Sequence, residues 1–120
     1  MISVKKGGVL LHATAFKSSA GLAENVEIFV ASSAEEAVLN LKKAGYNLYM
    51  TTFDGKSATS IEFKMPLCVV IGGEGFGISK SIIKSGIGVT LPQQRADISY
   101  NASVAASIIT FLIATQHQKI

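Results

Sequence analysis

The most apolar run of the sequence, Leu67 to Ile71, passes directly into a loop rich in glycine. The loop contains four glycines and one acid, which are Gly72, Gly73, Gly75, Gly77 and Glu74. A short apolar run bounded by glycine predicts a buried strand. Glycines at this spacing let backbone amides approach a ligand closely and let the chain turn without a Cβ clash. The segment therefore predicts a buried strand that ends at a ligand-binding loop.

The register of these glycines excludes two familiar phosphate-binding loops. A dinucleotide fingerprint needs glycines at its first, third and sixth places; from Gly73 the sixth place is Ile78, and from Gly72 the third is Glu74. A P-loop needs Lys and then Ser or Thr after its last glycine, yet Ile78 follows Gly77. An acid inside a phosphate cradle would also repel the ligand. Glu74 suits a ligand with positive charge, an anchored donor such as arginine or a backbone amide, or plain solvation.

A second informative segment joins a strand to the last helix. The strand ends at Pro92, the loop carries Arg95, the only arginine, and the helix opens with small and amide residues from Ser99 onward. Ser99 or Asn101 can cap this helix. Small side chains at a helix start let its backbone pack against another segment or against a flat ligand.

The remaining elements alternate along the chain. The predicted strands are Gly7 to His12, Glu27 to Ala31, Tyr46 to Thr52, Leu67 to Ile71 and Ile87 to Leu91. The predicted helices cover about 34 to 44, 79 to 84 and 101 to 117. Strands that alternate with helices predict an α/β fold, a parallel sheet flanked by helices.

The first long helix carries clear boundary signals. Ser32 or Ser33 can cap it, acids follow in its first turn, and Gly45 ends it. The strand after it is followed by Asp54-Gly55, which predicts a turn.

Composition bounds the possibilities further. At 120 residues, the chain fits one domain covering residues 1–120. Hydrophobic residues at 48% and charged residues at 16% exclude a disordered tail. A net charge of +3 mildly favours an anionic partner such as RNA, although this charge is common in proteins that never meet nucleic acid.

Several classes of site are disfavoured. Cys68 is the only cysteine and predicts a buried, inert thiol, and His12 and His117 are too isolated to suggest a metal site. No apolar run approaches the ~20 residues that span a bilayer, and no signal peptide is visible. We therefore expect a cytoplasmic protein without metal or membrane contact.

The two segments together resemble the second and third motifs of the SpoU (TrmH) family of trefoil-knotted RNA ribose 2′-O-methyltransferases. The second motif resembles Gly-x-Glu-Gly-x-Gly after a strand, matched by Gly72 to Gly77. The third resembles Ile-Pro, a loop, then Ser-Leu-Asn-Val-Ser and an alanine-rich helix, matched by Leu91-Pro92 and by Ser99 to Ala106. Upstream, Lys17 to Glu24 and Gly45 to Tyr49 are similar to a connection and a strand of the family, so the resemblance covers nearly the whole chain.

The resemblance implies a SPOUT methyltransferase fold with a C-terminal trefoil knot and a bent S-adenosylmethionine held between three strand ends. The implied cofactor-binding residues are Thr51, Gly72, Gly75, Leu91, Tyr100 and Ser103. The implied catalytic residues are Glu74, Ser99 and Asn101. Tyr100 stands where the family usually has leucine, which implies a tighter pocket or an aromatic ring stacked on adenine. The implied partners are rRNA or tRNA and a second copy bound through the last helix.

One part of the family pattern has no counterpart in this sequence. The family assigns activation of the ribose hydroxyl to an arginine and an asparagine of its first motif, which would lie before Met1, so we expect the N-terminal strand and helix to be missing. Arg95 lies outside that place and is not promoted to catalyst. The chain is then a truncated or degenerate reading frame, or a partner supplies the strand. The alternative function is a non-catalytic module that binds S-adenosylmethionine or RNA, or that dimerises.

Overall fold

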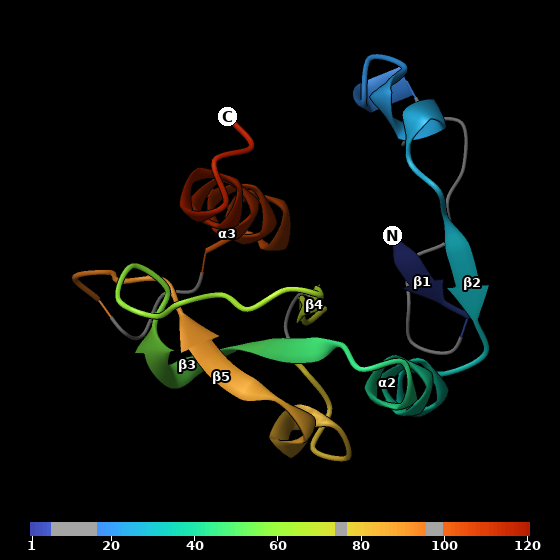
Figure 1. Cartoon of the computed structure of the whole chain (residues 1–120), viewed down its shortest axis with the longest axis horizontal. Coiled ribbons are helices and arrows are strands. Elements are labelled where there is room, and N and C mark those ends of the chain that lie inside the picture. Colours follow the sequence, from blue (N-terminus) through green and yellow to red (C-terminus); the bar gives the residue numbers. More distant parts are fainter. Residues whose placement is uncertain (6–16, 74–76, 96–99) are drawn as a thin grey trace. The chain divides into compact units, whose positions relative to one another are not determined.

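The computed structural model describes residues 1–5, 17–73, 77–95 and 100–120 (Figure 1). The chain divides into two compact units, Met1–Asn40 and Leu41–Ile120. The predicted strand from Gly7 to His12 lies outside the described residues. The single domain expected for residues 1–120 remains a prediction.

The N-terminal unit contains a small parallel sheet. Its strands are β1 (Ile2–Val4) and β2 (Phe29–Ala31), and the 3-10 helix η1 (Leu22–Asn25) lies between them in sequence. The Lys5 amide extends the pairing by donating to the Ala31 carbonyl at 3.0 Å. Strand β2 confirms the second half of the predicted strand 27–31. Strand β1 was not predicted, because three residues are too few to show an apolar period.

The helix α2 (Ala34–Lys43) begins and ends where the sequence predicts. The Ser33 hydroxyl accepts from the Glu36 amide at 3.2 Å, so Ser33 is the residue that caps it. Gly45 has φ 84° and its amide donates to the Lys42 carbonyl at 3.0 Å. This left-handed residue is the helix end that glycine favours.

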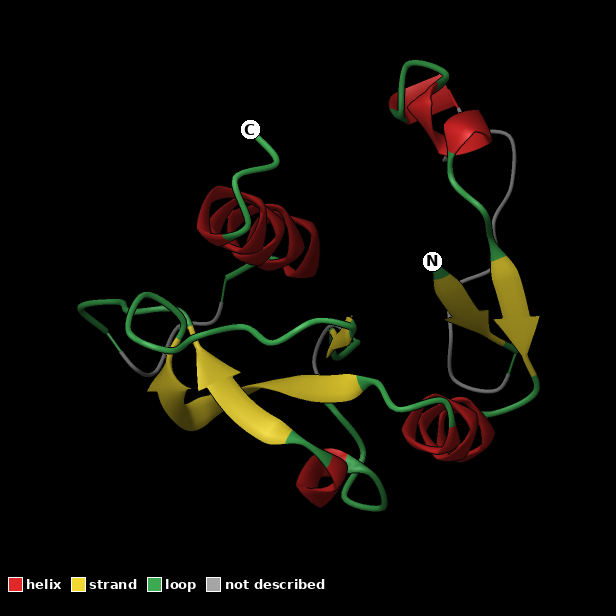
Figure 2. Ribbon diagram, viewed as in Figure 1, coloured by secondary structure: helices red, strands yellow, loops and turns green. Residues whose placement is uncertain are grey.

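The C-terminal unit is built on a three-stranded parallel sheet in the order β4-β3-β5 (Figure 2). The strands are β3 (Asn47–Ser57), β4 (Leu67–Val70) and β5 (Ile87–Thr90). Tyr49 of the central strand lies opposite Val69 on one side and Ile87 on the other. The predicted parallel α/β arrangement is confirmed.

The predicted turn at Asp54-Gly55 is wrong, because β3 continues to Ser57. Its register with β5 shifts between Thr51 and Lys56, both of which pair with Val89. The extra residues form a bulge, after which pairing with β5 resumes. Pairing with the parallel strand β5 continues at Lys56 and Ser57, where an isolated hairpin would have turned back.

The helix α3 (Ala102–Gln116) packs over one face of this sheet (Figure 1). The residues buried between them are Tyr49, Ala58, Phe63, Val89, Leu91 and Ile109. Met50, which points to the opposite face of β3, is also fully buried. Burial on both faces explains why the strands of this sheet read as continuous apolar runs.

The predicted helix of residues 79–84 is shorter than expected. Only the 3-10 helix η2 (Ile83–Ser85) forms, after a turn in which the Ile83 amide donates to the Ser79 carbonyl at 3.1 Å. A segment of this length makes too few hydrogen bonds to offset helix nucleation.

The connection from β3 to β4 is fastened to the C-terminal end of α3. The Gln116 carboxamide accepts from the Phe63 amide at 3.0 Å and donates to the Ile61 carbonyl at 2.7 Å. The rings of Tyr49 and Phe63 meet edge to face at 4.8 Å. The two Gln116 hydrogen bonds join residues more than 50 positions apart and hold the end of α3 to the connection.

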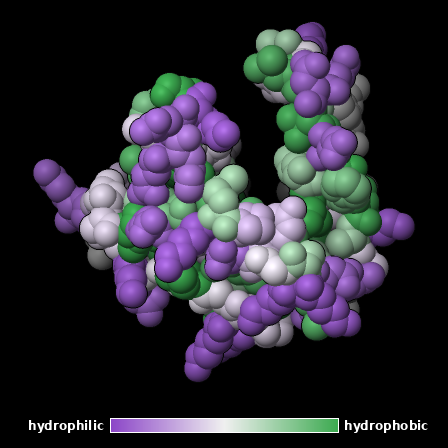
Figure 3. Space-filling model, viewed as in Figure 1, coloured by the Kyte–Doolittle hydropathy of each residue, from purple (hydrophilic) through white to green (hydrophobic). Residues whose placement is uncertain are grey.

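Apolar side chains remain at the surface of the N-terminal unit, as the green areas there show (Figure 3). Phe29 is 61% and Val30 is 57% exposed on β2. A sheet of two strands cannot bury both of its faces by itself. Among the described residues no helix combines the length and the apolar character needed to cross a membrane.

Candidate functional site

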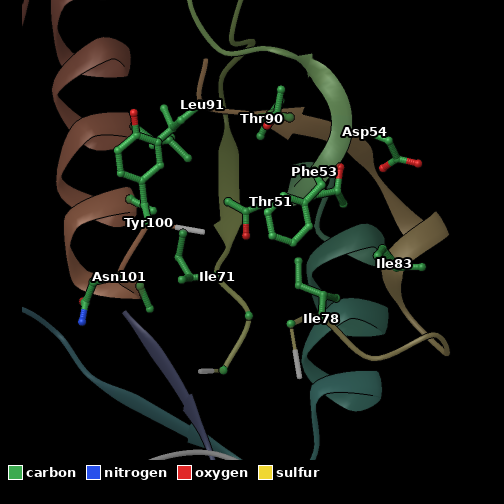
Figure 4. A pocket seen from close by; sticks show the side chains of 18 of the residues that line it. Thr51, Phe53, Asp54, Ile71, Ile78, Ile83, Thr90, Leu91, Tyr100 and Asn101 are labelled. Carbon is green, nitrogen blue, oxygen red and sulfur yellow. The ribbon is translucent and has the colours of Figure 1, made fainter. Parts of the chain in front are cut away.

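A cavity of about 870 Å³ opens in the C-terminal unit at the carboxyl ends of β3, β4 and β5 (Figure 4). Three walls surround it: the end of β3 with its bulge, the glycine loop after β4, and the segment from β5 into α3. In open parallel sheets ligands bind at this edge, because the strand ends and their loops converge there. The cavity volume lies in the range of about 300–1,000 Å³ typical of small-molecule sites.

The glycine loop forms a closed wall. Gly73 and Gly77 pair as an antiparallel bridge, and the Gly77 amide donates to the Gly73 carbonyl at 3.0 Å. A Cβ on Gly72 would lie 2.5 Å from the Gly77 carbonyl carbon and 2.7 Å from the Ile78 nitrogen. The two arms of the loop can therefore approach only when residue 72 has no side chain.

The β3 wall carries two threonines with different environments. The Thr51 hydroxyl donates to the Val70 carbonyl of the neighbouring strand at 3.0 Å. The Thr52 hydroxyl is buried, and no hydrogen-bond partner for it was found among the described residues. Beyond them the bulge presents Phe53 and Asp54 along the cavity.

The third wall runs from the end of β5 into α3. Leu91 is buried in the core that α3 shares with the sheet. The Tyr100 hydroxyl donates to the Pro92 carbonyl at 3.1 Å, which ties the beginning of the helix to the end of the strand. Figure 4 shows the Phe53 ring pointing into the cavity from β3, toward the side where Tyr100 lies.

Asn101 is the cap of α3. Its side-chain oxygen accepts from the Ser103 amide at 2.9 Å and from the Ser103 hydroxyl at 2.7 Å. Of the two residues that the sequence allows as caps, Asn101 therefore performs this role. The same contacts hold its carboxamide at the edge of the cavity.

The structure brings most of the sequence-predicted site residues together. The cavity is lined by Thr51, Gly72, Leu91, Tyr100 and Asn101. Ser103 contacts Asn101 and is not part of the lining. Glu74, Gly75 and Ser99 lie outside the described residues. Sequence reasoning missed the bulge residues Thr52 and Phe53, whose only visible signal was the Asp-Gly pair that follows them.

The electrostatics of the site are simple. Asp54 is the single charged residue among the described residues that line the cavity. Cys68 on β4 lies outside the lining, and burial raises the pKa of its thiol above the ordinary value. No group of three side chains suited to a metal ion was found within residues 1–5, 17–73, 77–95 and 100–120. The described lining residues other than Asp54 are therefore uncharged, and they mix apolar side chains with hydroxyl and amide groups.

Comparison with known proteins identifies the chain. Residues 1–111 match the model of the SpoU rRNA Methylase family. An uncharacterized tRNA/rRNA methyltransferase of Archaeoglobus fulgidus is 32% identical over 103 residues, which cover 85% of this chain and 46% of that protein. The chain thus spans about half the length of the curated relatives it matches.

Solved structures share the fold. One was described as giving structural insights into the 2-OH methylation of C/U34 on tRNA; it matches with a TM-score of 0.85 at 16% identity, covering 99% of this chain and 79% of that one. The SpoU methyltransferase AviRb from Streptomyces viridochromogenes, in complex with AdoMet, matches with a TM-score of 0.83 at 22% identity, covering 98% of this chain and 47% of that one.

Proposed function

Because the chain belongs to the SpoU rRNA Methylase family, we propose that its cavity binds S-adenosylmethionine and that it forms the cofactor-binding part of an enzyme that methylates a ribose 2′-hydroxyl in rRNA or tRNA. One observation carries the proposal: three parallel strands end at a single cavity lined by Thr51, Gly72 and Leu91. This arrangement supports the binding of a folded nucleoside by strand ends. Such an enzyme would act in the cytoplasm.

The residues present fit this cofactor. Gly72 leaves no room for a side chain, so the loop backbone itself forms the cavity wall. Apolar side chains from all three walls, among them Phe53, Ile71 and Leu91, suit a heterocycle and a thioether chain. Asp54 at the edge suits the positive charge that the cofactor carries.

The protein's contribution is mainly binding and alignment. When bound, the cofactor supplies an electrophilic methyl group on a sulfonium. Backbone groups of Gly72, Leu91 and Tyr100 are proposed to hold the nucleoside, with Thr51, Gly75 and Ser103 as further cofactor-binding positions. The Thr51 hydroxyl is already bonded to the Val70 carbonyl, so Thr51 would contribute its backbone and methyl surface. Alignment of a ribose hydroxyl with the methyl group then supplies much of the rate.

Three polar residues are proposed to serve the reaction itself. Glu74, Ser99 and Asn101 match the polar positions of the family's catalytic crevice, and Asn101 is the one that lies among the described residues. The resemblance assigns proton removal to an arginine of the first motif, which has no counterpart in the 120 residues. We therefore expect this chain to bind the cofactor and to be inactive by itself.

The proposed assembly is a knotted homodimer. The resemblance implies that the C-terminal part is threaded into a trefoil knot. Along α3, Val104, Ile108 and Phe111 are 45%, 36% and 61% exposed. Apolar residues at these helical spacings form a stripe that a second copy would cover. RNA is the proposed substrate of the whole assembly.

Titration calorimetry of the chain with S-adenosylmethionine and with S-adenosylhomocysteine tests the cofactor site. The expected result is one binding site per chain, with ATP and NAD showing no comparable binding. Tight binding of ATP or NAD in place of the two sulfur nucleosides would contradict the proposal.

A methyl-transfer assay with labelled cofactor and total RNA separates the enzyme from the alternative, a non-catalytic binding module. Labelled ribose in RNA after addition of a protein that carries the first motif, and none without it, would support the enzyme. Cofactor binding without transfer under either condition would support the module.

A further inference from the structure

Phe53 is an apolar ring left uncovered inside a cavity. Its side chain is 65% exposed, although the residue lines the cavity at the end of β3. Exposed aromatic rings in a concave site are typical of surfaces that a ligand covers. We therefore expect a bound ligand to cover this ring.

The direction of the ring is set inside the bulge of β3. The register of β3 with β5 shifts between Thr51 and Lys56, and Phe53 lies between these two residues and lines the cavity. Figure 4 agrees, because its ring points into the cavity toward the side of Tyr100.

The opposite wall is also aromatic and is held in place. Tyr100 lines the same cavity and is 40% exposed. Its hydroxyl donates to the Pro92 carbonyl at 3.1 Å, so the ring is fixed before any ligand arrives. A fixed ring loses little freedom when a flat ligand packs against it.

The chemistry around Phe53 selects one part of a ligand. Among the described lining residues the only charge is that of Asp54, and the lining includes the apolar side chains of Ile71 and Leu91. A planar, uncharged heterocycle suits such walls, because rings stack on aromatic faces. The charged amino-acid end of a sulfur nucleoside does not suit these walls.

We infer that Phe53 is the stacking residue for the purine ring of the cofactor, with Tyr100 on the opposite wall. The inference rests on the proposed function, since it names the residue that would give the same cavity its preference for an adenine nucleoside. It depends on the aromatic residue at position 53.

The test compares two phenylalanines of similar exposure. Phe53→Ala removes the ring in the cavity, and Phe29→Ala removes a ring that is 61% exposed on β2 and does not line the cavity. Calorimetry measures the affinity of each variant for S-adenosylhomocysteine and for 5′-methylthioadenosine, which lacks the amino-acid end. Phe53→Trp restores a stacking surface.

Phe53→Ala should lower the affinity for both ligands by the same factor, roughly 5-fold to 100-fold, as expected for the loss of one base-stacking ring. Phe29→Ala should leave both affinities unchanged, and Phe53→Trp should restore most of the loss. Thermal unfolding of the free variants should match the wild type, which shows that the loss is not a loss of fold.

Three results would overturn the inference. The first is an unchanged affinity of Phe53→Ala for both ligands, and the second is a loss confined to S-adenosylhomocysteine, which would place the ring at the amino-acid end. The third is a change of oligomeric state in Phe53→Ala with unaltered affinity, which would make the ring an interface between copies. Failure of the wild-type chain to bind either ligand would instead overturn the proposed function, and the inference with it.

Discussion

Two walls of the cavity depend on glycine, and they use it for different purposes. In the loop after β4, a Cβ on Gly72 would lie 2.5 Å from the Gly77 backbone, so glycine lets one loop close on itself. In the bulge of β3, a Cβ on Gly55 would lie 2.4 Å from the Val89 nitrogen, so glycine lets two strands meet. The first contact shapes the ligand site and the second holds the sheet together, which means that substitutions can separate binding from folding.

The largest effect is expected at the bulge. Gly55→Ala would force β3 away from β5 at a backbone contact that cannot yield, and should lower the free energy of unfolding by about 3 kcal/mol. Urea denaturation measures this. The matched control is Gly73→Ala, whose Cβ would meet no atom within 4 Å among the described residues. Equal stability of the two variants would show that the bulge does not depend on glycine.

A smaller loss of stability, with a large loss of binding, is expected in the loop. Gly72→Ala should lower the free energy of unfolding by about 1–2 kcal/mol, because its Cβ would meet backbone within one loop and would not separate two paired strands. Affinity for S-adenosylhomocysteine should fall at least about tenfold, because a loss of ~1.4 kcal/mol of binding free energy from the displaced loop backbone is enough for this change. Calorimetry on Gly72→Ala and on the wild-type chain decides this; an unchanged affinity of Gly72→Ala would show that this glycine does not shape the ligand site.

The third wall should respond through its helix cap. Asn101→Ala removes the acceptor of the Ser103 amide and should cost about 1 kcal/mol of stability. Asn101→Asp keeps a side-chain oxygen that can accept from this amide, so this variant should retain most of the wild-type stability. Thermal unfolding of both variants is the measurement, and an alanine variant as stable as the wild type would show that other contacts hold the start of α3.

The smallest effect has the opposite sign. Thr52→Val replaces a buried hydroxyl that has no identified partner in the described part of the chain with a methyl group of the same shape. The free energy of unfolding should rise by up to about 1 kcal/mol, because an unsatisfied buried hydroxyl is unfavourable. Thr51→Val removes the donor to the Val70 carbonyl, so its free energy of unfolding should be lower than that of the wild type. A lower stability of Thr52→Val would reveal a partner for that hydroxyl.

The difference between the walls also explains what could be predicted from the sequence. The glycine loop was predictable because four glycines after an apolar strand form a local signal, and α2 was predictable because Ser33 and Gly45 mark its ends. The bulge was not, because Asp54-Gly55 has the same local signature in a hairpin turn and in a bulge. Only the neighbouring strand β5, far away in sequence, decides between the two.

The same reasoning applies to the site. Thr51, Gly72, Leu91, Tyr100 and Asn101 were found because they belong to motifs that are contiguous in sequence and converge at strand ends. Phe53 was missed, because its place in the cavity follows from the bulge and from the position of α3. Strand β1 was missed because its pairing with β2 joins residues 27 positions apart.

The most direct test of a sulfur-nucleoside site at the ends of β3, β4 and β5 is a titration of the isotope-labelled chain with S-adenosylhomocysteine, followed by the amide signals of each residue in nuclear magnetic resonance spectra. We predict that the largest and saturable shifts fall on Phe53, Gly72, Leu91 and Tyr100, which line one cavity from three walls. Saturable shifts confined to other residues, or none at all, would contradict it.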